Sequence, residues 1–154
     1  MTTEKTTAKF RAPTGLEALF NRVFGFFVGL GMGPKYIYLL QVRGRKTGRL
    51  YSLPVNLMEV GGKRILVAPR GRTQWVRNAE AAGEITLKRR STRLGYGLQV
   101  IPDGDKLEFL KMYLDRYSGA VQRYFPIPAG SPTEAFRDIA GNYPVFELVS
   151  RPAI

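Results

Sequence analysis

Residues Gly44 to Arg49 read Gly-Arg-Lys-Thr-Gly-Arg and form the most informative stretch of this sequence. Gly44 and Gly48 allow a positive φ, so that consecutive backbone N–H groups can converge on an oxyanion. Thr47 adds a hydroxyl donor, and the three cations of the stretch are Arg45, Lys46 and Arg49. These residue types predict an anion-binding turn, with an ordinary basic hairpin turn as the alternative. The spacing is not the G-x-x-x-x-G-K-[ST] of a nucleotide-binding P-loop.

The sequence contains no cysteine and no histidine. Disulfides, thiolate nucleophiles, structural zinc sites and Ser-His-Asp triads are therefore excluded, because the atoms they need are missing. Redox chemistry would have to come from a bound cofactor, since no side chain of this protein carries it. The pair of acids in Asp103-Gly-Asp105 is interpreted as a helix cap, and we expect no metal site.

The net charge of +12 is concentrated in one part of the chain. Residues 35–93 carry +11, whereas residues 1–34 carry +2 and residues 94–154 carry −1. Such a field favours a polyanion, an anionic membrane surface or a small phosphorylated ligand, and a basic surface kept for solubility is the alternative. Aromatic residues are not interleaved with the cations as in single-strand binders, so no nucleic-acid partner is expected.

The N-terminal part of the chain predicts an arm followed by a helix. Residues 1–13 are rich in Thr and Lys and indicate a flexible arm without a signal peptide, and residues 14–154 are expected to form one domain. Apolar residues recur at helical spacing from about 15 to 30. The apolar run is too short to span a bilayer, so this helix is interpreted as packing on the core or resting on a membrane surface.

The rest of the sequence favours an α+β, mostly β, domain. Strands are predicted at Tyr36–Arg43, Leu50–Val60, Lys63–Pro69, Glu84–Arg90, about 93–102, and Val145–Val149. A short helix is predicted over Thr73–Ala82, with Thr73 as N-cap and Gly83 after its end. Another helix is expected from its cap Asp103 to about Tyr117, with residues 118–142 irregular. Six short strands indicate a small antiparallel β-barrel with helices outside it, because closure removes exposed strand edges.

Four stretches of the chain together resemble a known family. They are Leu39–Arg49, Pro54-Val55, Ile65–Gly71 and Trp75-Val-Arg-Asn78. The combination is similar to the deazaflavin (F420)-dependent nitroreductases and quinone reductases of actinobacteria, within the flavin/deazaflavin oxidoreductase superfamily. The resemblance implies a split β-barrel of the FMN-binding type, with an N-terminal helix and two further helices outside the barrel.

The resemblance also implies roles for individual residues. The turn would hold the phosphate and polar tail of coenzyme F420, and the next strand would lie along its deazaflavin ring. The third strand's end would supply ring-edge donors and a basic residue, Trp75 would wall the pocket, and the Asn78 amide would hold a loop. The implied cofactor-binding residues are Arg45, Lys46, Thr47, Gly48, Arg49, Leu53, Pro54, Val55, Ala68, Pro69, Arg70, Gly71, Trp75 and Asn78.

Some positions stay open within this interpretation. Pro69 stands where the family often has a serine, Leu53 stands where it often has a polar residue, and core packing is an alternative for Trp75. Strand alternation predicts that Leu53, Val55 and Asn56 line one side of the ring. Catalytic residues on the substrate side are expected among the tyrosines: Tyr117 and Tyr124 are the candidates, and Tyr113 is a further candidate for which core packing is the favoured role.

The function implied is hydride transfer from reduced F420 to a quinone, nitroaromatic or enone acceptor. FMN bound at the same turn is an alternative, and so is a non-catalytic protein that binds F420 or another anionic ligand such as lipid or nucleic acid. We expect a cytoplasmic monomer or homodimer with a small-molecule acceptor. The hypothesis of peripheral contact with the inner face of the membrane through the N-terminal helix follows from its phenylalanines and the basic body.

Overall fold

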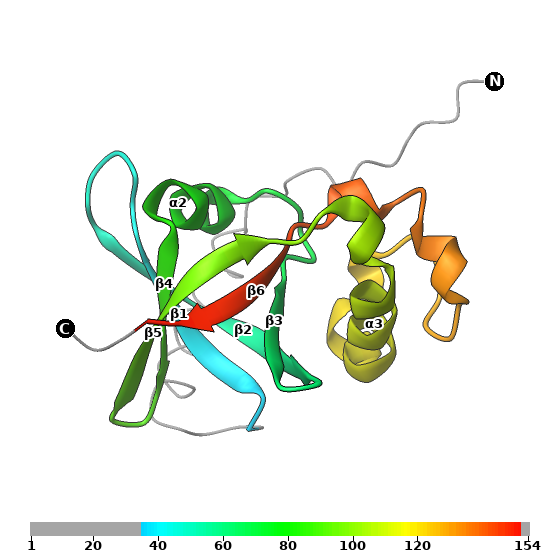
Figure 1. The fold of residues 1–154 in the computed structure, drawn as a ribbon, viewed down its shortest axis with the longest axis horizontal. Coiled ribbons are helices and arrows are strands. Elements are labelled where there is room, and N and C mark those ends of the chain that lie inside the picture. Colours follow the sequence, from blue (N-terminus) through cyan, green and yellow to red (C-terminus); the bar gives the residue numbers. More distant parts are fainter. Residues whose placement is uncertain (1–34, 152–154) are drawn as a thin grey trace.

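The computed structural model describes residues 35–151 (Figure 1). The arm predicted at 1–13 and the helix predicted at about 15–30 lie outside the described residues. Within the described part of the chain, no helix is long and apolar enough to cross a membrane.

Six antiparallel strands form a closed barrel in the order β1-β2-β3-β6-β5-β4. Their bounds are β1 Ile37–Arg43, β2 Leu50–Val60, β3 Lys63–Val67, β4 Glu84–Arg89, β5 Thr92–Val100 and β6 Val145–Ser150. The ring is completed by pairing of β1 with β4 and by insertion of β6 between β3 and β5. The prediction of a six-stranded antiparallel barrel is therefore confirmed, with strand ends displaced by one or two residues.

Two hydrophobic cores lie on the two faces of β3. Leu66 belongs to the barrel interior together with Leu40 and Phe146. Its neighbours Ile65 and Val67 face the opposite way and belong to the core outside the barrel. Successive side chains of a strand point to opposite faces, so a strand covered on both faces must be apolar at consecutive positions. This explains the unbroken run Ile65–Val67.

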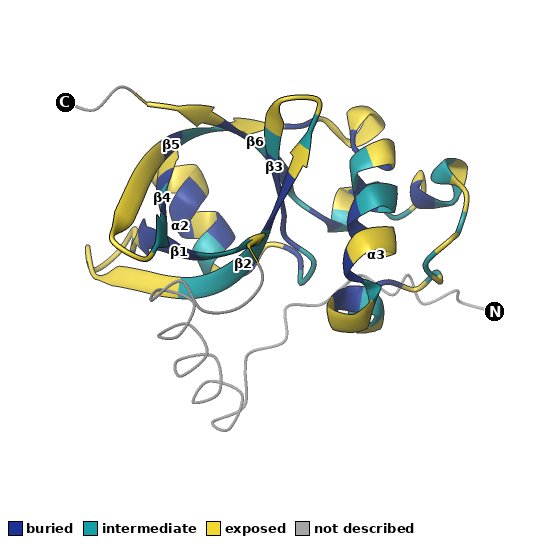
Figure 2. Ribbon diagram, turned by 90° about the horizontal axis from the view of Figure 1, so that it is seen from below, coloured by how far each residue is buried: buried dark blue, intermediate teal, exposed yellow. Residues whose placement is uncertain are grey.

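Helix α2 (Gln74–Ala82) lies across one end of the barrel (Figures 1 and 2). Its buried residues Val76 and Ala79 join the interior core and close that end. Gly83 ends the helix with φ of 72°, a left-handed conformation that glycine adopts at little cost. The predicted end is confirmed. Thr73 stands at the expected N-cap position, but its side chain makes no capping hydrogen bond.

Helix α3 (Leu107–Val121) packs against the side of the barrel and differs from the prediction at both ends (Figure 2). Asp103 does not cap it, because Asp103–Asp105 forms a separate 3-10 turn and the Asp103 carboxylate pairs with Lys106 at 2.7 Å. The helix also continues past Tyr117, where the backbone is locally non-helical. The segment predicted as irregular contains three further 3-10 turns: Gln122–Tyr124, Thr133–Phe136 and Ala140–Asn142.

Candidate functional site

The turn between β1 and β2 is closed by its own backbone. Gly44 N–H donates to the Arg49 carbonyl at 2.7 Å, and Gly48 N–H donates to the Gly44 carbonyl at 2.9 Å. Gly48 has φ of 72°, as expected. Gly44 does not have a positive φ and is needed for another reason: a Cβ there would lie 2.7 Å from the Tyr51 ring. The expectation that both glycines supply positive φ is wrong for Gly44.

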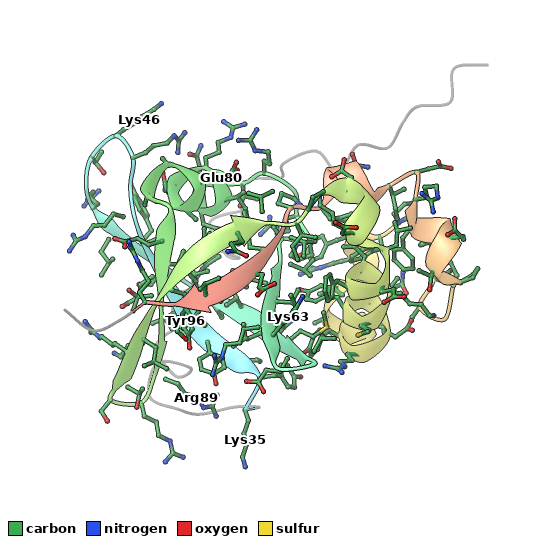
Figure 3. All side chains as sticks on the ribbon, viewed as in Figure 1. Lys35, Lys46, Lys63, Glu80, Arg89 and Tyr96 are labelled. Atoms are coloured by element: carbon green, nitrogen blue, oxygen red, sulfur yellow. The ribbon has the colours of Figure 1, made fainter. Side chains whose placement is uncertain are left out.

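Helix α2 holds this turn through Asn78. The buried Asn78 Oδ1 accepts a hydrogen bond from Arg45 N–H at 3.1 Å and another from Arg45 Nη1 at 2.8 Å. Arg45 Nη1 also donates to Gln74 Oε1 at 3.0 Å. The guanidinium of Arg45 is therefore fixed along the first turns of α2, whereas Lys46 stands at the exposed tip of the hairpin (Figure 3).

A pocket of about 830 Å³ begins at this turn, follows β2 and ends beside α3. Figure 1 shows that the turn and α3 lie at opposite sides of the molecule, with α2 between them. Twelve of the residues predicted for the site line this pocket: Arg45, Lys46, Thr47, Leu53, Pro54, Val55, Asn56, Pro69, Arg70, Trp75, Asn78 and Tyr124. The structure thus brings together residues spread over 80 positions of the sequence.

The pocket is electropositive at several points along its length. Four cations, Arg45, Lys46, Arg70 and Arg123, line it, and none of its described lining residues is acidic. Between these charges the walls are apolar, with Leu53, Pro54 and Val55 on β2 and Val121 on α3. The Trp75 indole borders the pocket and also packs edge-on against Phe146, with 6.4 Å between the ring centroids.

Five predicted residues do not border the pocket: Gly48, Arg49, Ala68, Gly71 and Tyr117. Ala68 is buried in the barrel core, and Gly71 forms the bend before α2 with φ of 83°. Tyr117 packs against Tyr113 at 5.2 Å and Tyr36 at 4.8 Å between ring centroids, and burial raises its pKa.

Tyrosine side chains gather at the α3 end of the pocket. Tyr113 is 2% exposed, borders the pocket and is hydrogen bonded to the Asn56 side chain. Burial raises the pKa of Tyr113 well above its usual value, and the bond to Asn56 only partly offsets this. Tyr124 stands between two cations, with Arg123 Cζ 4.9 Å and Arg70 Cζ 5.8 Å from its ring centroid. At neutral pH Tyr113 keeps its proton and can act as a hydrogen-bond donor.

Residues 18–125 match the model of the family described as F420H(2)-dependent quinone reductase. This chain belongs to the F420H(2)-dependent quinone reductase family. The match includes the β1–β2 turn, the whole of β2, α2 and the tyrosines of α3, and therefore every described residue that lines the pocket. None of the curated proteins searched matches this family member.

Solved structures resemble this F420H(2)-dependent quinone reductase family member in fold. A protein of unknown function from Agrobacterium tumefaciens, Atu2129, is 17% identical with a TM-score of 0.54, covering 92% of this chain and 58% of its own. The heme storage protein HutZ from Vibrio cholerae is 7% identical with a TM-score of 0.52, covering 77% and 84%. An F420-H2 dependent reductase, FDR-A, is 18% identical with a TM-score of 0.49, covering 74% and 94%.

The residues of this family member's pocket fit the coenzyme that the family name implies. A ligand with a flat ring and an anionic tail needs an apolar slot continuous with a cationic end. The apolar residues of β2 and Trp75 line the pocket and meet the first need, and Arg45 and Lys46 meet the second, with no carboxylate among the described lining residues.

Several pocket residues of this family member were not predicted from its sequence. They are Ile37, Tyr51, Ser52, Val67, Thr73, Gln74, Ala120, Val121 and Arg123. Thr73 and Gln74 were assigned only to the start of a helix, although they adjoin Trp75 and share its helical turn. For Tyr113 the sequence favours core packing over a place at the acceptor, and the structure shows a residue that is buried and also borders the pocket. Helical spacing alone cannot make that distinction.

Proposed function

We propose that this protein is an oxidoreductase that takes hydride from reduced coenzyme F420 and delivers it to a quinone held in the same pocket. The observation that carries the proposal is one continuous cavity of about 830 Å³ that joins a cationic turn at one end to the buried Tyr113 and the partly buried Tyr124 at the other. Its volume falls in the upper part of the range typical of ligand sites, which leaves room for an acceptor next to a cofactor.

The turn and β2 serve the cofactor side. Arg45 and Lys46 would bind the anionic tail, and Leu53, Pro54 and Val55 would lie against the ring as an apolar wall. Trp75 also borders the pocket and would keep water away from the ring. When bound in its reduced form, the coenzyme supplies a hydride, and these residues hold it where a planar acceptor can approach.

Tyrosines serve the acceptor side. Tyr113 and Tyr124 border the α3 end of the pocket, where their hydroxyls would donate hydrogen bonds to a quinone carbonyl. This chain has no histidine, so the proton taken up by the acceptor oxygen comes from such a hydroxyl or from water. Apolar walls beside these donors suit nitroaromatic and enone acceptors as well.

The test mixes reduced F420 with menadione and follows the loss of the reduced-state absorbance with and without protein. We expect oxidation to require the protein and to be unchanged in Lys63→Ala, a control that removes an exposed cation of β3 outside the pocket. Tight binding without oxidation across quinone, nitroaromatic and enone acceptors would instead indicate a carrier. Absence of F420 binding, or purification with bound flavin, would contradict the proposal.

A further inference from the structure

Two arginines meet at the α3 end of the pocket, on the side of the molecule away from the β1–β2 turn (Figure 1). Arg70 comes from the loop between β3 and α2, and Arg123 comes from the 3-10 turn that follows α3. Both line the pocket and lie over the Tyr124 ring, with Cζ-to-centroid distances of 5.8 Å for Arg70 and 4.9 Å for Arg123. Two separate segments of the chain therefore place cations at one tyrosine of the acceptor side.

The charge of Arg123 is not balanced by a carboxylate in the described part of the chain. The acidic residues nearest to it in the sequence, Asp115 and Glu134, form ion pairs with other residues. None of the described lining residues of the pocket is acidic, and Arg70 adds a second positive charge at the same place. A pocket wall with charges of one sign attracts ligands of the opposite sign, so this end of the pocket favours an anion.

The 3-10 turn that carries Arg123 is fixed by hydrogen bonds of both neighbouring residues. On one side, the buried Tyr143 donates its hydroxyl proton to the Tyr124 carbonyl at 2.6 Å. On the other side, Gln122 Nε2 donates to the Ile127 carbonyl at 2.8 Å. Binding a ligand therefore requires ordering of the Arg123 side chain alone, and a backbone that is already in place lowers the entropy cost of binding.

Arg123 has no role on the coenzyme side of the pocket. In the proposed function the anionic tail binds at Arg45 and Lys46 and the ring lies along β2, and the family resemblance adds Arg70 at the ring edge. Neither gives a role to Arg123, which adjoins Tyr124 on the acceptor side. A neutral quinone gains nothing from a cation there, whereas an acceptor with a negative charge would bind to it.

We infer that Arg123, with Arg70 beside it, forms an anion site for the acceptor, and that the preferred acceptor is a quinone that carries a carboxylate. This inference rests on the proposed function and refines its substrate class. A guanidinium matches a carboxylate with two parallel hydrogen bonds, which fixes the orientation of the acceptor. The carboxylate itself takes no part in the redox step. The quinone gains a hydride from the reduced coenzyme and a proton from a hydroxyl or water, becoming the hydroquinone, and the donor recovers the proton lost when the coenzyme is oxidised.

The test compares two matched acceptors, a 1,4-naphthoquinone with a propionate side chain and the methyl ester of the same compound. Oxidation of reduced F420 gives kcat and KM for each. In wild type the KM for the acid should be about fivefold or more below that for the ester at low salt, and the difference should shrink as salt rises. Arg123→Gln should remove most of this preference by raising the KM for the acid alone, with kcat near that of wild type. Arg123→Lys keeps the charge and should restore part of the preference.

Binding without turnover gives a second readout. Each acceptor is titrated by calorimetry into protein saturated with oxidised F420, which has no hydride to give. Wild type should bind the acid more tightly than the ester, and Arg123→Gln should bind both alike. Arg93→Gln, which removes an exposed arginine of β5 outside the pocket, is the matched control and should behave as wild type. Neither variant should change the affinity for F420 more than about twofold.

The outcomes separate this inference from the proposed function. Equal KM values for acid and ester in wild type, or a preference for the acid that survives in Arg123→Gln, would overturn the inference and leave the proposed function standing. Equal weakening of both acceptors in Arg123→Gln, or a clear loss of F420 affinity, would show that Arg123 does not read the charge of the acceptor. Wild type that reduces neither acceptor with reduced F420 would remove the proposed function itself.

Discussion

Replacing Asn78 tests whether α2 holds the β1–β2 turn in a form ready to bind an anion. Asn78→Leu is close in volume and removes the acceptor of two hydrogen bonds, one from Arg45 N–H at 3.1 Å and one from Arg45 Nη1 at 2.8 Å. Asn78→Asp keeps an oxygen at that position for both donors but places a carboxylate against the guanidinium. The two variants therefore separate support of the turn from the charge of the turn.

The expected magnitudes follow from these contacts. A neutral hydrogen bond contributes about 0.5–1.5 kcal/mol and one to a charged group about 1.5–3 kcal/mol. Arg45 is exposed and keeps its bond to Gln74, so the charged contact counts at or below its lower limit. Asn78→Leu should therefore lower the free energy of unfolding by about 2 kcal/mol. Asn78→Asp should stay within about 0.5 kcal/mol of wild type or exceed it.

Urea unfolding can be followed by the fluorescence of Trp75, the only tryptophan of the sequence. F420 titrations on the same proteins measure the second effect. We expect both variants to bind F420 at least tenfold more weakly, Asn78→Leu because the turn is released and Asn78→Asp because the Arg45 charge is neutralised. Gln74→Ala, which removes one exposed contact, serves as the mild control. Wild-type affinity in Asn78→Asp would refute the role of Arg45 as an anion ligand.

Three further outcomes are expected. Lys46→Ala should weaken F420 binding only a few-fold and only at low salt, because Lys46 is exposed; equal loss at high salt in titrations would argue for a direct contact. Tyr143→Phe should lower stability to urea by about 1–2 kcal/mol, since the buried Tyr143 hydroxyl donates to the Tyr124 carbonyl at 2.6 Å. Asp115 accepts from Gly130 N–H and Lys111, which lowers its pKa below 3.8, so its charged form stabilises the fold above that pH. Asp115→Asn should be less stable by under about 1 kcal/mol at pH 7, and urea midpoints should converge as the pH falls through the carboxyl's lowered pKa.

The strands could be predicted from the sequence because their signals are local. Leu50–Val60 and Lys63–Val67 are joined by two glycines, and the structure gives both a positive φ as a tight hairpin needs. The start of α3 could not be predicted in the same way. Asp103 has the right residue type for a cap, but Lys106, buried and bonded to the Ala140 carbonyl, takes up its carboxylate. That competition depends on a residue 34 positions away.

In the candidate site too, features with a local sequence signal could be predicted and features that depend on distant residues could not. The turn at 44–49 could be predicted from its glycine spacing and consecutive cations, because these are properties of neighbouring residues. The Thr73 hydroxyl has no hydrogen-bond partner among the described residues. The sequence gives no sign of this, because a threonine before a helix normally caps it. Likewise, Tyr113 and Tyr117 lie one helical turn apart on α3, and only the packed barrel decides which of them borders the pocket.

The position of β6 in the ring has a consequence for how the chain folds. β6 bridges β3 and β5, although it follows the other five strands in the sequence and is separated from β5 by α3 and the 3-10 turns. During synthesis the edges of β3 and β5 stay unpaired until residues 145–150 leave the ribosome, and unpaired edges invite association between chains. Closure of the ring is a contact between distant parts of the chain and should be a late event. Nascent chains that stop before 145 are therefore expected to be the species that most need a chaperone.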